Sequence, residues 1–259
     1  RIRLANDMRI AVFEHQFEML YQPIVELETG KIHKAEALIR WHHPLRGIVS
    51  PAEFISIAEE TGLILTISDW AFSEVVREVE RWRRRHYAQF QISFNISPTL
   101  FQDKPNYADW FGELEKRNMS GEGIVMEITE GVLLVSNRHV IERLAEFHRH
   151  GMEIALDDFG TGYSSLSYLK KFDIEYLKID QAFVRNIGSE PKDMALCEAI
   201  IVMAHKLDMK VIAEGIQNDE QKRLLAAAGC DYGQGYLFSE PLTAAEFENL
   251  LERSDGGKS

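Results

Sequence analysis

From residue 90 onward the chain alternates between short apolar segments and longer amphipathic ones, and this alternation limits the possible fold more than any other feature. The apolar segments have the length of buried strands, and the amphipathic ones have helical spacing. Strands are predicted at residues 90–95, 123–128, 153–157, 176–180, 210–214 and 230–232. Helices are predicted at residues 107–116, 138–150, 164–170, 193–207, 219–228 and 244–251. Strands alternating with helices are typical of parallel βα units.

The part before residue 90 is less regular. A helix is predicted at residues 8–19, strands at 19–25 and 31–39, a loop at 41–49 and a helix at 68–84. The two strands, separated by Glu28-Thr29-Gly30, resemble a hairpin. Another helix is predicted to start after Ser50 as its N-cap, with Pro51 at the first position and Glu53 in the capping-box position.

These elements together predict an α/β fold. About eight strands in 259 residues fit a modified TIM-type (β/α)8 barrel, and the opening hairpin predicts one antiparallel strand near the N-terminus. No linker interrupts residues 8–251, so we expect one domain over residues 1–259 with its core at about 8–251. Because the chain begins at Arg1, we expect it to come from a longer protein.

Composition excludes several classes of partner. The formal net charge of -12 argues against binding nucleic-acid polymers or anionic membranes. No apolar run approaches the ~18 residues that span a bilayer, so we expect a cytoplasmic domain without membrane contact, although its parent protein could be membrane-tethered. Cys197 and Cys230 have no metal or redox spacing and are interpreted as buried hydrophobic residues. The basic run at residues 81–86 is interpreted as a solvated helix end.

A pair of adjacent carboxylates, Asp157 and Asp158, directly follows the apolar strand, and a glycine-rich loop comes next. Two like charges side by side repel each other, and burying either is costly unless a cation compensates it. The pair therefore predicts a divalent metal ion at the end of this strand.

Polar residues also lie at or near the ends of the other predicted strands. They are Glu36, Asn95, Glu127, Lys178, Glu214 and Gln234. In a barrel these ends meet on one face, where active sites lie. Oxygen ligands without a matching His or Cys cluster favour Mg²⁺ or Mn²⁺ over zinc. Two such ions are the usual device for cleaving phosphodiesters, and Lys178 would orient the attacking water or neutralise phosphate charge.

Each of these residues taken alone has a structural alternative. Glu214 could cap the next helix, Asn95 could form a turn, and Lys178 could pair with Asp180 or Glu175. Arg40 is interpreted either as a phosphate ligand or as the partner of a neighbouring acid.

Three further residues near this face are predicted to play supporting roles. Glu130 is predicted to hold the loop at residues 158–165, by accepting hydrogen bonds from it. His42 and His43 are interpreted as packing or rim residues rather than metal ligands.

Ordered motifs from residue 21 to residue 242 resemble the EAL-domain cyclic-di-GMP phosphodiesterases. They are YQPI at 21–24, EALIR at 36–40, NIS at 95–97, EITE at 127–130, DDFGTGYSS at 157–165, KID at 178–180, EGI at 214–216, QGY at 234–236 and FSEPL at 238–242. The tripeptide EAL at residues 36–38 would be uninformative alone, whereas so many family motifs in the same order are specific.

The resemblance implies roles for individual residues. One ion would be held by Glu36, Asn95, Glu127 and Asp157, and a second by Asp157, Asp158 and Glu214. Lys178 would contact the nucleophilic water, with Glu214 as a candidate base. The dinucleotide would contact Gln22, Leu38, Arg40 and Gln234. The implied reaction is Mg²⁺- or Mn²⁺-dependent hydrolysis of one 3′–5′ bond of cyclic-di-GMP to linear pGpG.

The resemblance also implies a homodimer through the surface near residues 158–165. Two positions depart from the family pattern, Gln217 where Glu is frequent and Glu240 where Lys is frequent. The alternative function is a catalytically silent receptor that binds cyclic-di-GMP and signals through a partner. Such a receptor is expected to have lost metal ligands, whereas every predicted ligand is present in this chain.

Overall fold

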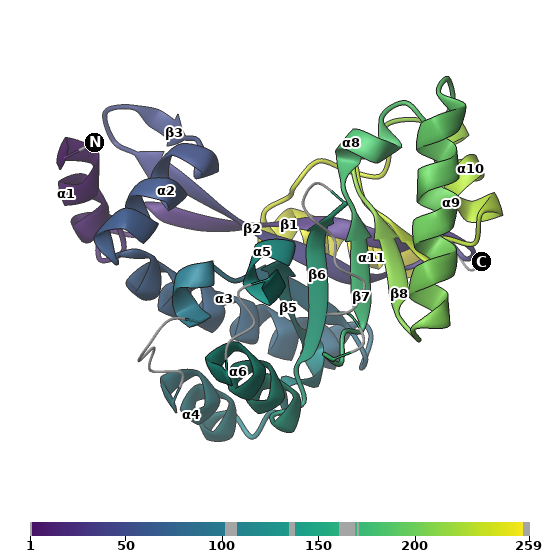
Figure 1. Cartoon of the computed structure of the whole chain (residues 1–259). Helices are drawn as coiled ribbons and strands as arrows, with labels where there is room; N and C mark the ends of the chain where they lie inside the picture. Colours follow the sequence, from purple (N-terminus) through teal and green to yellow (C-terminus); the bar gives the residue numbers. More distant parts are fainter. Residues whose placement is uncertain (1, 102–107, 135–137, 161–168, 170, 256–259) are drawn as a thin grey trace.

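The computed structural model describes residues 2–101, 108–134, 138–160, 169 and 171–255, and it contains a closed barrel surrounded by helices (Figure 1). Its strands are β1 (Phe17–Glu26), β2 (Ile32–His43), β3 (Gly47–Val49), β4 (Gln91–Asn95), β5 (Ile124–Thr129), β6 (Glu153–Phe159), β7 (Tyr176–Ile179), β8 (Lys210–Ala213) and β9 (Tyr232–Gly233). They follow the order β1-β9-β8-β7-β6-β5-β4-β2, and the β1–β2 ladder closes the ring. β1 is antiparallel to both neighbours, β3 extends β2 as an antiparallel strand outside the ring, and the other neighbouring strands pair in parallel. The predicted barrel with one antiparallel N-terminal strand is therefore confirmed.

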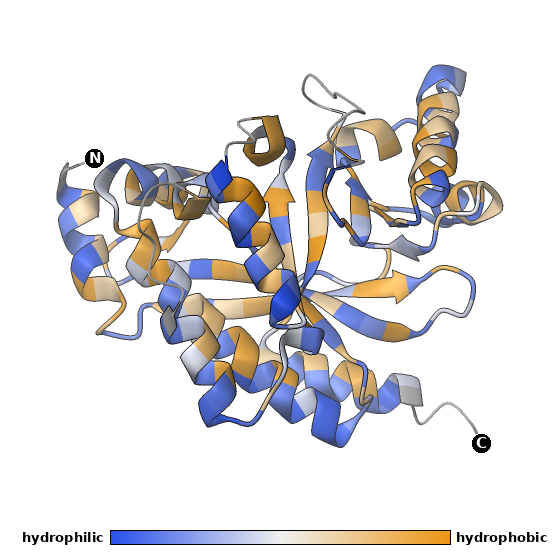
Figure 2. Cartoon of the chain, turned by 60° about the horizontal axis from the view of Figure 1, so that its bottom comes forward, coloured by the Kyte–Doolittle hydropathy of each residue, from blue (hydrophilic) through white to orange (hydrophobic). Residues whose placement is uncertain are grey.

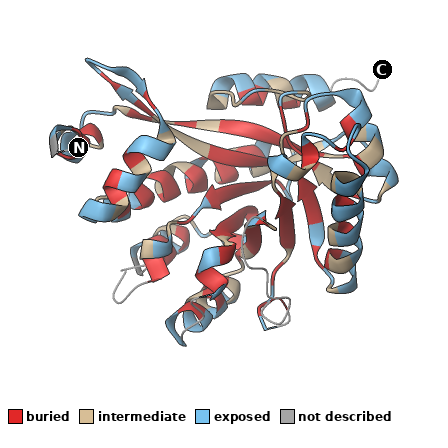
Figure 3. Ribbon diagram, turned by 45° about the horizontal axis from the view of Figure 1, so that its top comes forward, coloured by how far each residue is buried: buried red, intermediate tan, exposed pale blue. Residues whose placement is uncertain are grey.

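The helices of the described residues mostly cover the outside of this barrel. They are α1 (Ile2–Ala11), α2 (Pro51–Thr61), α3 (Ile64–Arg85), α4 (Ala108–Lys116), α5 (Glu130–Leu134), α6 (Arg138–Arg149), α8 (Gln181–Val184), α9 (Pro191–Lys206), α10 (Asp219–Ala227) and α11 (Ala244–Asp255), with 3-10 turns η1 (Pro98–Phe101) and η2 (Gly121–Gly123). Figure 3 shows the buried strands at the centre and the exposed faces of the helices outside. The helices predicted near α4, α6, α9, α10 and α11 are confirmed, while the one predicted at residues 164–170 lies almost wholly outside the described residues.

The N-terminal predictions were wrong in three places. The helix expected at residues 8–19 ends at Ala11, and β1 already begins at Phe17, because burial alternates along Phe17, Met19 and Tyr21 with the period of a strand. The loop expected at residues 41–49 contains the end of β2 and all of β3, which pair antiparallel. The capping box was also wrong, since Ser50 precedes α2 but its side chain caps no backbone N–H.

The outer halves of β1 and β2 leave the barrel and form an N-terminal lobe with β3, α1 and α2 (Figure 1). β2 pairs with β4 only from Lys34 to Ala37, so Glu36 lies inside a long strand rather than at its end. A separate apolar cluster around Phe17, Trp41 and Phe54 holds the lobe together.

Two sets of contacts hold the C-terminal helix α11 against α3 and β1. Trp82 of α3 packs against Tyr21 and Phe247, with ring centroids 4.9 Å and 4.7 Å apart. The basic run at the end of α3 does more than face solvent, because Arg81 and Arg85 both pair with the largely buried Glu248 of α11.

Cys197 and Cys230 are both buried, as predicted, and burial raises the pKa of their thiols to about 11 and about 12.

The inside of the barrel is layered. Side chains two positions apart on a strand share a face, and bands of alternating hydropathy run along the strands in Figure 2. An interior apolar layer, formed by Ile24, Val125, Ala155, Tyr176 and Ile212, is distinct from the main core. Each member lies two residues from a polar side chain of the upper face. The layer thus separates the upper mouth, at the carboxyl ends of the strands, from the lower mouth.

Candidate active site

Lys178 of β7 lies at the centre of the upper mouth and is fully buried. Its Nζ is 2.7 Å from Glu127 Oε2 and 2.7 Å from Glu214 Oε1. It is 3.3 Å from Asp157 Oδ1 and 3.4 Å from Glu36 Oε2. Four carboxylates from different parts of the barrel therefore converge on one ammonium group.

The simple ion pairs considered for Lys178 are not formed. Asp180 instead caps α8 by accepting from the backbone N–H of Ala182, and Glu175 accepts from the backbone N–H of Ile154. Glu214 also does not cap the next helix, because Asn218 and Gln221 form the capping box of α10.

The carboxylate of Glu36 accepts a hydrogen bond from an amide side chain at each of its two oxygens. Asn95 Nδ2 donates to Glu36 Oε1 at 2.8 Å, and Gln234 Nε2 donates to Glu36 Oε2 at 2.7 Å. Gln234 Nε2 also donates to Gln22 Oε1 at 2.9 Å. These bonds orient the carboxylate of Glu36 toward Lys178 and connect β1, β2 and β4 with the segment after β9.

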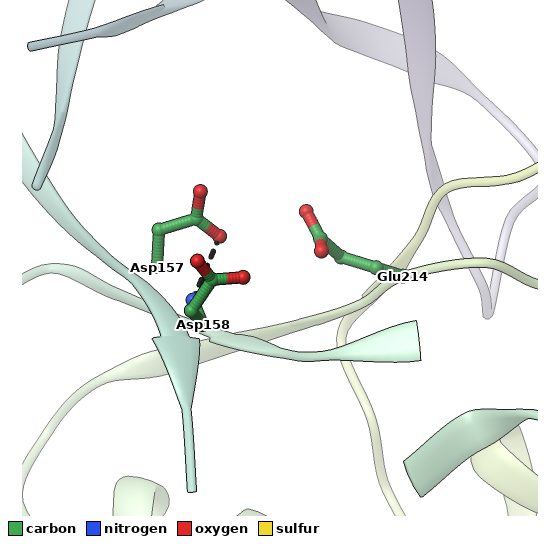
Figure 4. Close-up of side chains that lie close together, drawn as sticks. All are labelled: Asp157, Asp158 and Glu214. Atoms are coloured by element: carbon green, nitrogen blue, oxygen red, sulfur yellow. Dashed lines mark hydrogen bonds between the residues drawn. The ribbon is translucent and has the colours of Figure 1, made fainter. Parts of the chain in front are cut away.

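A second group consists of Asp157, Asp158 and Glu214, each of which offers an oxygen within 4.8 Å of the other two (Figure 4). The Asp158 backbone N–H donates to Asp157 Oδ1 at 2.9 Å, and Asp158 has a positive φ of 54°. The register of β6 with β7 is irregular between Leu156 and Phe159. This local distortion allows both adjacent aspartates to face Glu214 instead of pointing to opposite sides of the sheet.

The electrostatics show an excess of negative charge. Burial would raise the pKa of Glu36, but Lys178, Gln234 and Asn95 outweigh it and lower that pKa. Burial and the neighbouring Glu36 raise the pKa of Glu127 well above its usual value, and burial raises the pKa of Glu214 to about 7. Although burial opposes it, the carboxylates raise the pKa of Lys178.

A divalent cation fits this donor set. One ammonium faces several buried carboxylates whose raised pKa values report uncompensated charge. In addition, Glu127 Oε1 and Gln234 Oε1 are buried without a hydrogen-bond partner among the described residues. Carboxylate and amide oxygens of this kind are the ligands that Mg²⁺ and Mn²⁺ prefer.

The site opens into a cavity of about 380 Å³. It is lined by Gln22, Glu36, Leu38, Arg40, Asp157, Gln181, Glu214, Gly215, Gln217, Gln234, Gly235, Tyr236 and Pro241. The predicted dinucleotide contacts Gln22, Leu38, Arg40 and Gln234 all line it. Arg40 donates only to the backbone carbonyl of Ile39 among the described residues, at 2.9 Å, so its guanidinium keeps donors for a ligand.

Sequence reasoning assigned no role to five residues that line this cavity, Gln181, Gly215, Gly235, the exposed Tyr236 and Pro241. Tyr236 stood within the QGY motif, whereas Gln181 had no signal except its position after KID. Only a glycine fits at position 235, where the chain passes close to Ile216 just before Tyr236, because a Cβ there would lie 2.2 Å from the Ile216 carbonyl oxygen. The departing residue Gln217 also lines the cavity, and Glu240 does not.

The remaining predicted residues lie apart. Glu130 begins α5 and is buried, and its carboxylate oxygens have no hydrogen-bond partner among the described residues. Most of the loop that it is predicted to hold, residues 161–165, lies outside the described residues, so that role stays a prediction. His43 is buried with Asp7 3.1 Å away, and exposed His42 pairs with Glu18, so neither His is brought to the carboxylates.

Comparison with known proteins assigns the family. The EAL domain model matches residues 5–241, and the chain belongs to the EAL domain family. Among similar proteins is the cyclic di-GMP phosphodiesterase PdeR of Escherichia coli, 36% identical over 250 residues, which cover 96% of this chain and 38% of PdeR. The cyclic di-GMP phosphodiesterase NbdA of Pseudomonas aeruginosa is 34% identical, with 96% of this chain and 32% of NbdA covered. The chain thus spans well under half of these relatives.

Solved structures agree with this assignment. The PaMucR phosphodiesterase in complex with c-di-GMP superposes with a TM-score of 0.89 at 32% identity, covering 95% of this chain and 99% of that one. The EAL enzyme Bd1971, in its cAMP- and cyclic-di-GMP-bound form, also has a TM-score of 0.89, at 36% identity, covering 96% of this chain and 68% of that one.

No helix in the described part of the chain is long and apolar enough to cross a membrane.

Proposed function

We propose that this domain is a cyclic-di-GMP phosphodiesterase that hydrolyses one 3′–5′ phosphodiester bond to give linear pGpG, using two Mg²⁺ or Mn²⁺ ions. The observation that carries the proposal is the convergence of four carboxylates on the buried Lys178 beside the Asp157–Asp158–Glu214 group. The relatives named for this activity, PdeR and NbdA, match nearly the whole chain and support it.

The residues that would hold the ions fall into two overlapping sets. Glu36, Asn95, Glu127 and Asp157 form one set, and Asp157, Asp158 and Glu214 form the other. Bound ions of this kind polarise phosphoryl oxygens and lower the pKa of water. Asp157 belongs to both sets, which explains why the chain places two adjacent aspartates at a distorted strand end.

The chain's own side chains then position the substrate and the proton. Arg40 lines the cavity with guanidinium donors left for a ligand and would bind a phosphate oxygen, while Gln22 and Gln234 offer amide groups to the dinucleotide. Lys178 would donate to the attacking water and hold it in line with phosphorus. Glu214 lies 2.7 Å from Lys178 Nζ, beside the place where that water would be held, and is the candidate base that would accept its proton.

Three further properties belong to this proposal. We infer a single domain over residues 1–259 that works in the cytoplasm, where a nucleotide messenger would be its substrate. We infer a homodimer through the surface near residues 158–165, of which only Asp158, Phe159 and Gly160 are described.

A hydrolysis assay tests the proposal directly. The domain is incubated with cyclic-di-GMP and Mg²⁺ or Mn²⁺, with and without EDTA, and the products are separated by chromatography. We expect pGpG only when the metal is present. Cyclic-di-GMP that binds but stays intact would instead establish the silent receptor, and preferred cleavage of cyclic mononucleotides would indicate a different phosphohydrolase.

A further inference from the structure

The lower mouth of the barrel contains a second polar cavity, of about 470 Å³. Gln91, Glu153, Tyr176 and Tyr232 are the first residues of β4, β6, β7 and β9, and they line it with Lys34 of β2. The apolar layer of the barrel interior separates this cavity from the carboxylates of the upper mouth. The lower face of such a barrel usually serves stability, and a stabilising plug would be apolar.

Lys34 makes this cavity unusual. It is 7% exposed, its Nζ donates to Tyr176 Oη at 2.7 Å and contacts Gln91 Oε1, and it lies 4.3 Å from the Tyr176 ring centroid. Among the described residues, Lys34 forms no ion pair within 4.0 Å, and the charge of Glu153 acts on it only from a greater distance. The barrel thus keeps a buried cation without a direct counter-ion at the wall of an open cavity, a costly arrangement unless an anion completes it.

Carboxylates line the same cavity. Glu153 accepts from Gln91 Nε2 at 2.7 Å, and Glu26 lies at the end of β1. Glu122 is at the rim, 3.7 Å from Arg83 Nη2. A ligand that carries only positive or only negative charge would therefore meet a like charge, because Lys34 repels cations and the carboxylates repel anions. A ligand that carries both signs would pair with both.

Aromatic rings supply much of the remaining wall, together with Arg83 and Gln89. His33 stacks on Tyr87 with centroids 4.1 Å apart, and Tyr232 is half-buried beside Lys34, with its ring centroid 5.3 Å from Nζ. We propose that the lower mouth binds a small zwitterion, a free amino acid with an apolar or aromatic side chain. Its carboxylate would face Lys34 and its ammonium Glu153, while its side chain packs on the tyrosines.

Calorimetry with matched ligands tests the two charges separately. L-phenylalanine carries both, phenethylamine lacks the carboxylate, and 3-phenylpropionate lacks the ammonium; L-leucine tests the need for an aromatic ring. We expect L-phenylalanine to bind the intact domain at least about tenfold more tightly than either single-charge analogue, the factor expected for losing one charge-assisted contact. L-Leucine should also bind. Failure of both amino acids to bind, or equal affinity for the three phenyl compounds, would overturn the proposal.

Variants then locate the site. Lys34→Met and Glu153→Gln should each weaken binding about tenfold or more, whereas Lys31→Met, which removes an exposed lysine nearby, should not. Glu36→Ala should bind L-phenylalanine like the wild type, because Glu36 belongs to the upper mouth. Equal affinity in Lys34→Met and Lys31→Met, or loss of binding in Glu36→Ala alone, would place the ligand elsewhere and refute the assignment. If Lys34→Met does not fold, the calorimetric comparison of the ligands on the wild-type protein still tests the proposal.

Discussion

Replacing Lys178 by Met should destabilise the metal-free protein strongly. At an effective dielectric constant of about 20, each contact of 2.7–3.4 Å between Nζ and a carboxylate oxygen corresponds to about 5–6 kcal/mol of attraction. Most of this is offset by desolvation and by repulsion among the carboxylates. Removing one partner of a buried ion pair costs about 3–5 kcal/mol net, because the other partner keeps its burial penalty. We expect a loss of that size, since four carboxylates would lose the ammonium that all of them contact.

The same variant should respond more strongly to metal than the wild type. A ligand at 100 times its Kd stabilises the folded state by about 2.7 kcal/mol, and Lys178→Met offers it carboxylates that no ammonium competes for. Urea unfolding in EDTA and in Mg²⁺, with Lys31→Met as the matched surface control, measures both effects. A Lys178→Met protein within about 1 kcal/mol of the wild type in EDTA would show that the ammonium does not hold this cluster together.

Three further predictions concern single residues. Glu36→Ala should reduce pGpG formation by more than about 100-fold, beyond the 10–100-fold typical of outer-shell changes; near-normal turnover would remove Glu36 from the metal ligands. Glu130→Ala should weaken metal affinity and activity about 10–100-fold if Glu130 holds the 158–165 loop, and unchanged titrations of activity against Mn²⁺ would contradict that role. Burial lowers the pKa of Lys34 from 10.5 to about 8, so between these values the unfolded chain binds more protons than the folded one. The free energy of unfolding should therefore gain up to about 3 kcal/mol from Lys34 as pH rises through this window. Lys34→Met should lack that gain in urea titrations at successive pH values, and parallel curves for the two proteins would refute it.

The barrel was predictable because each parallel strand carries its own signal. A run such as residues 154–156 is apolar on both faces and is followed by the polar Asp157, so it needs little tertiary information to be identified. The same property predicted which side chains meet, because the ends of parallel strands share one edge.

The N-terminal lobe was not predictable in this way. The end of β2 is half-exposed and contains Arg40, His42 and His43, so its local sequence resembles a loop. What holds it in a strand is the packing of Trp41 against Phe17 and Phe54, which are distant in sequence. Propensity yields to tertiary packing in such segments.

The contacts between side chains within the site could not be predicted from the sequence either. Strand-end positions predict that Lys178 and the carboxylates are neighbours, but not that one Nζ touches four of them. The polar lower mouth was missed because Lys34, Gln91 and Tyr176 lie at strand starts, each unremarkable alone. Only the closed ring brings them together.

The short ladder between β1 and β9 has a consequence for hydrogen exchange. β1 and β9 pair only through Val25–Gly233 and Glu26–Tyr232, and the nearby Tyr21–Leu242 bridge and Gln22–Gln234 bond complete the seam. Amides in so short a ladder should exchange through local opening well before those of the β5–β6 ladder. Because the upper cavity is lined by Gln22 on one side of this seam and by Gln234 and Tyr236 on the other, an occupant would bridge both edges. Binding should therefore slow exchange not only at the lining residues 234–236 but also at Tyr232 and Gly233, which do not line the cavity.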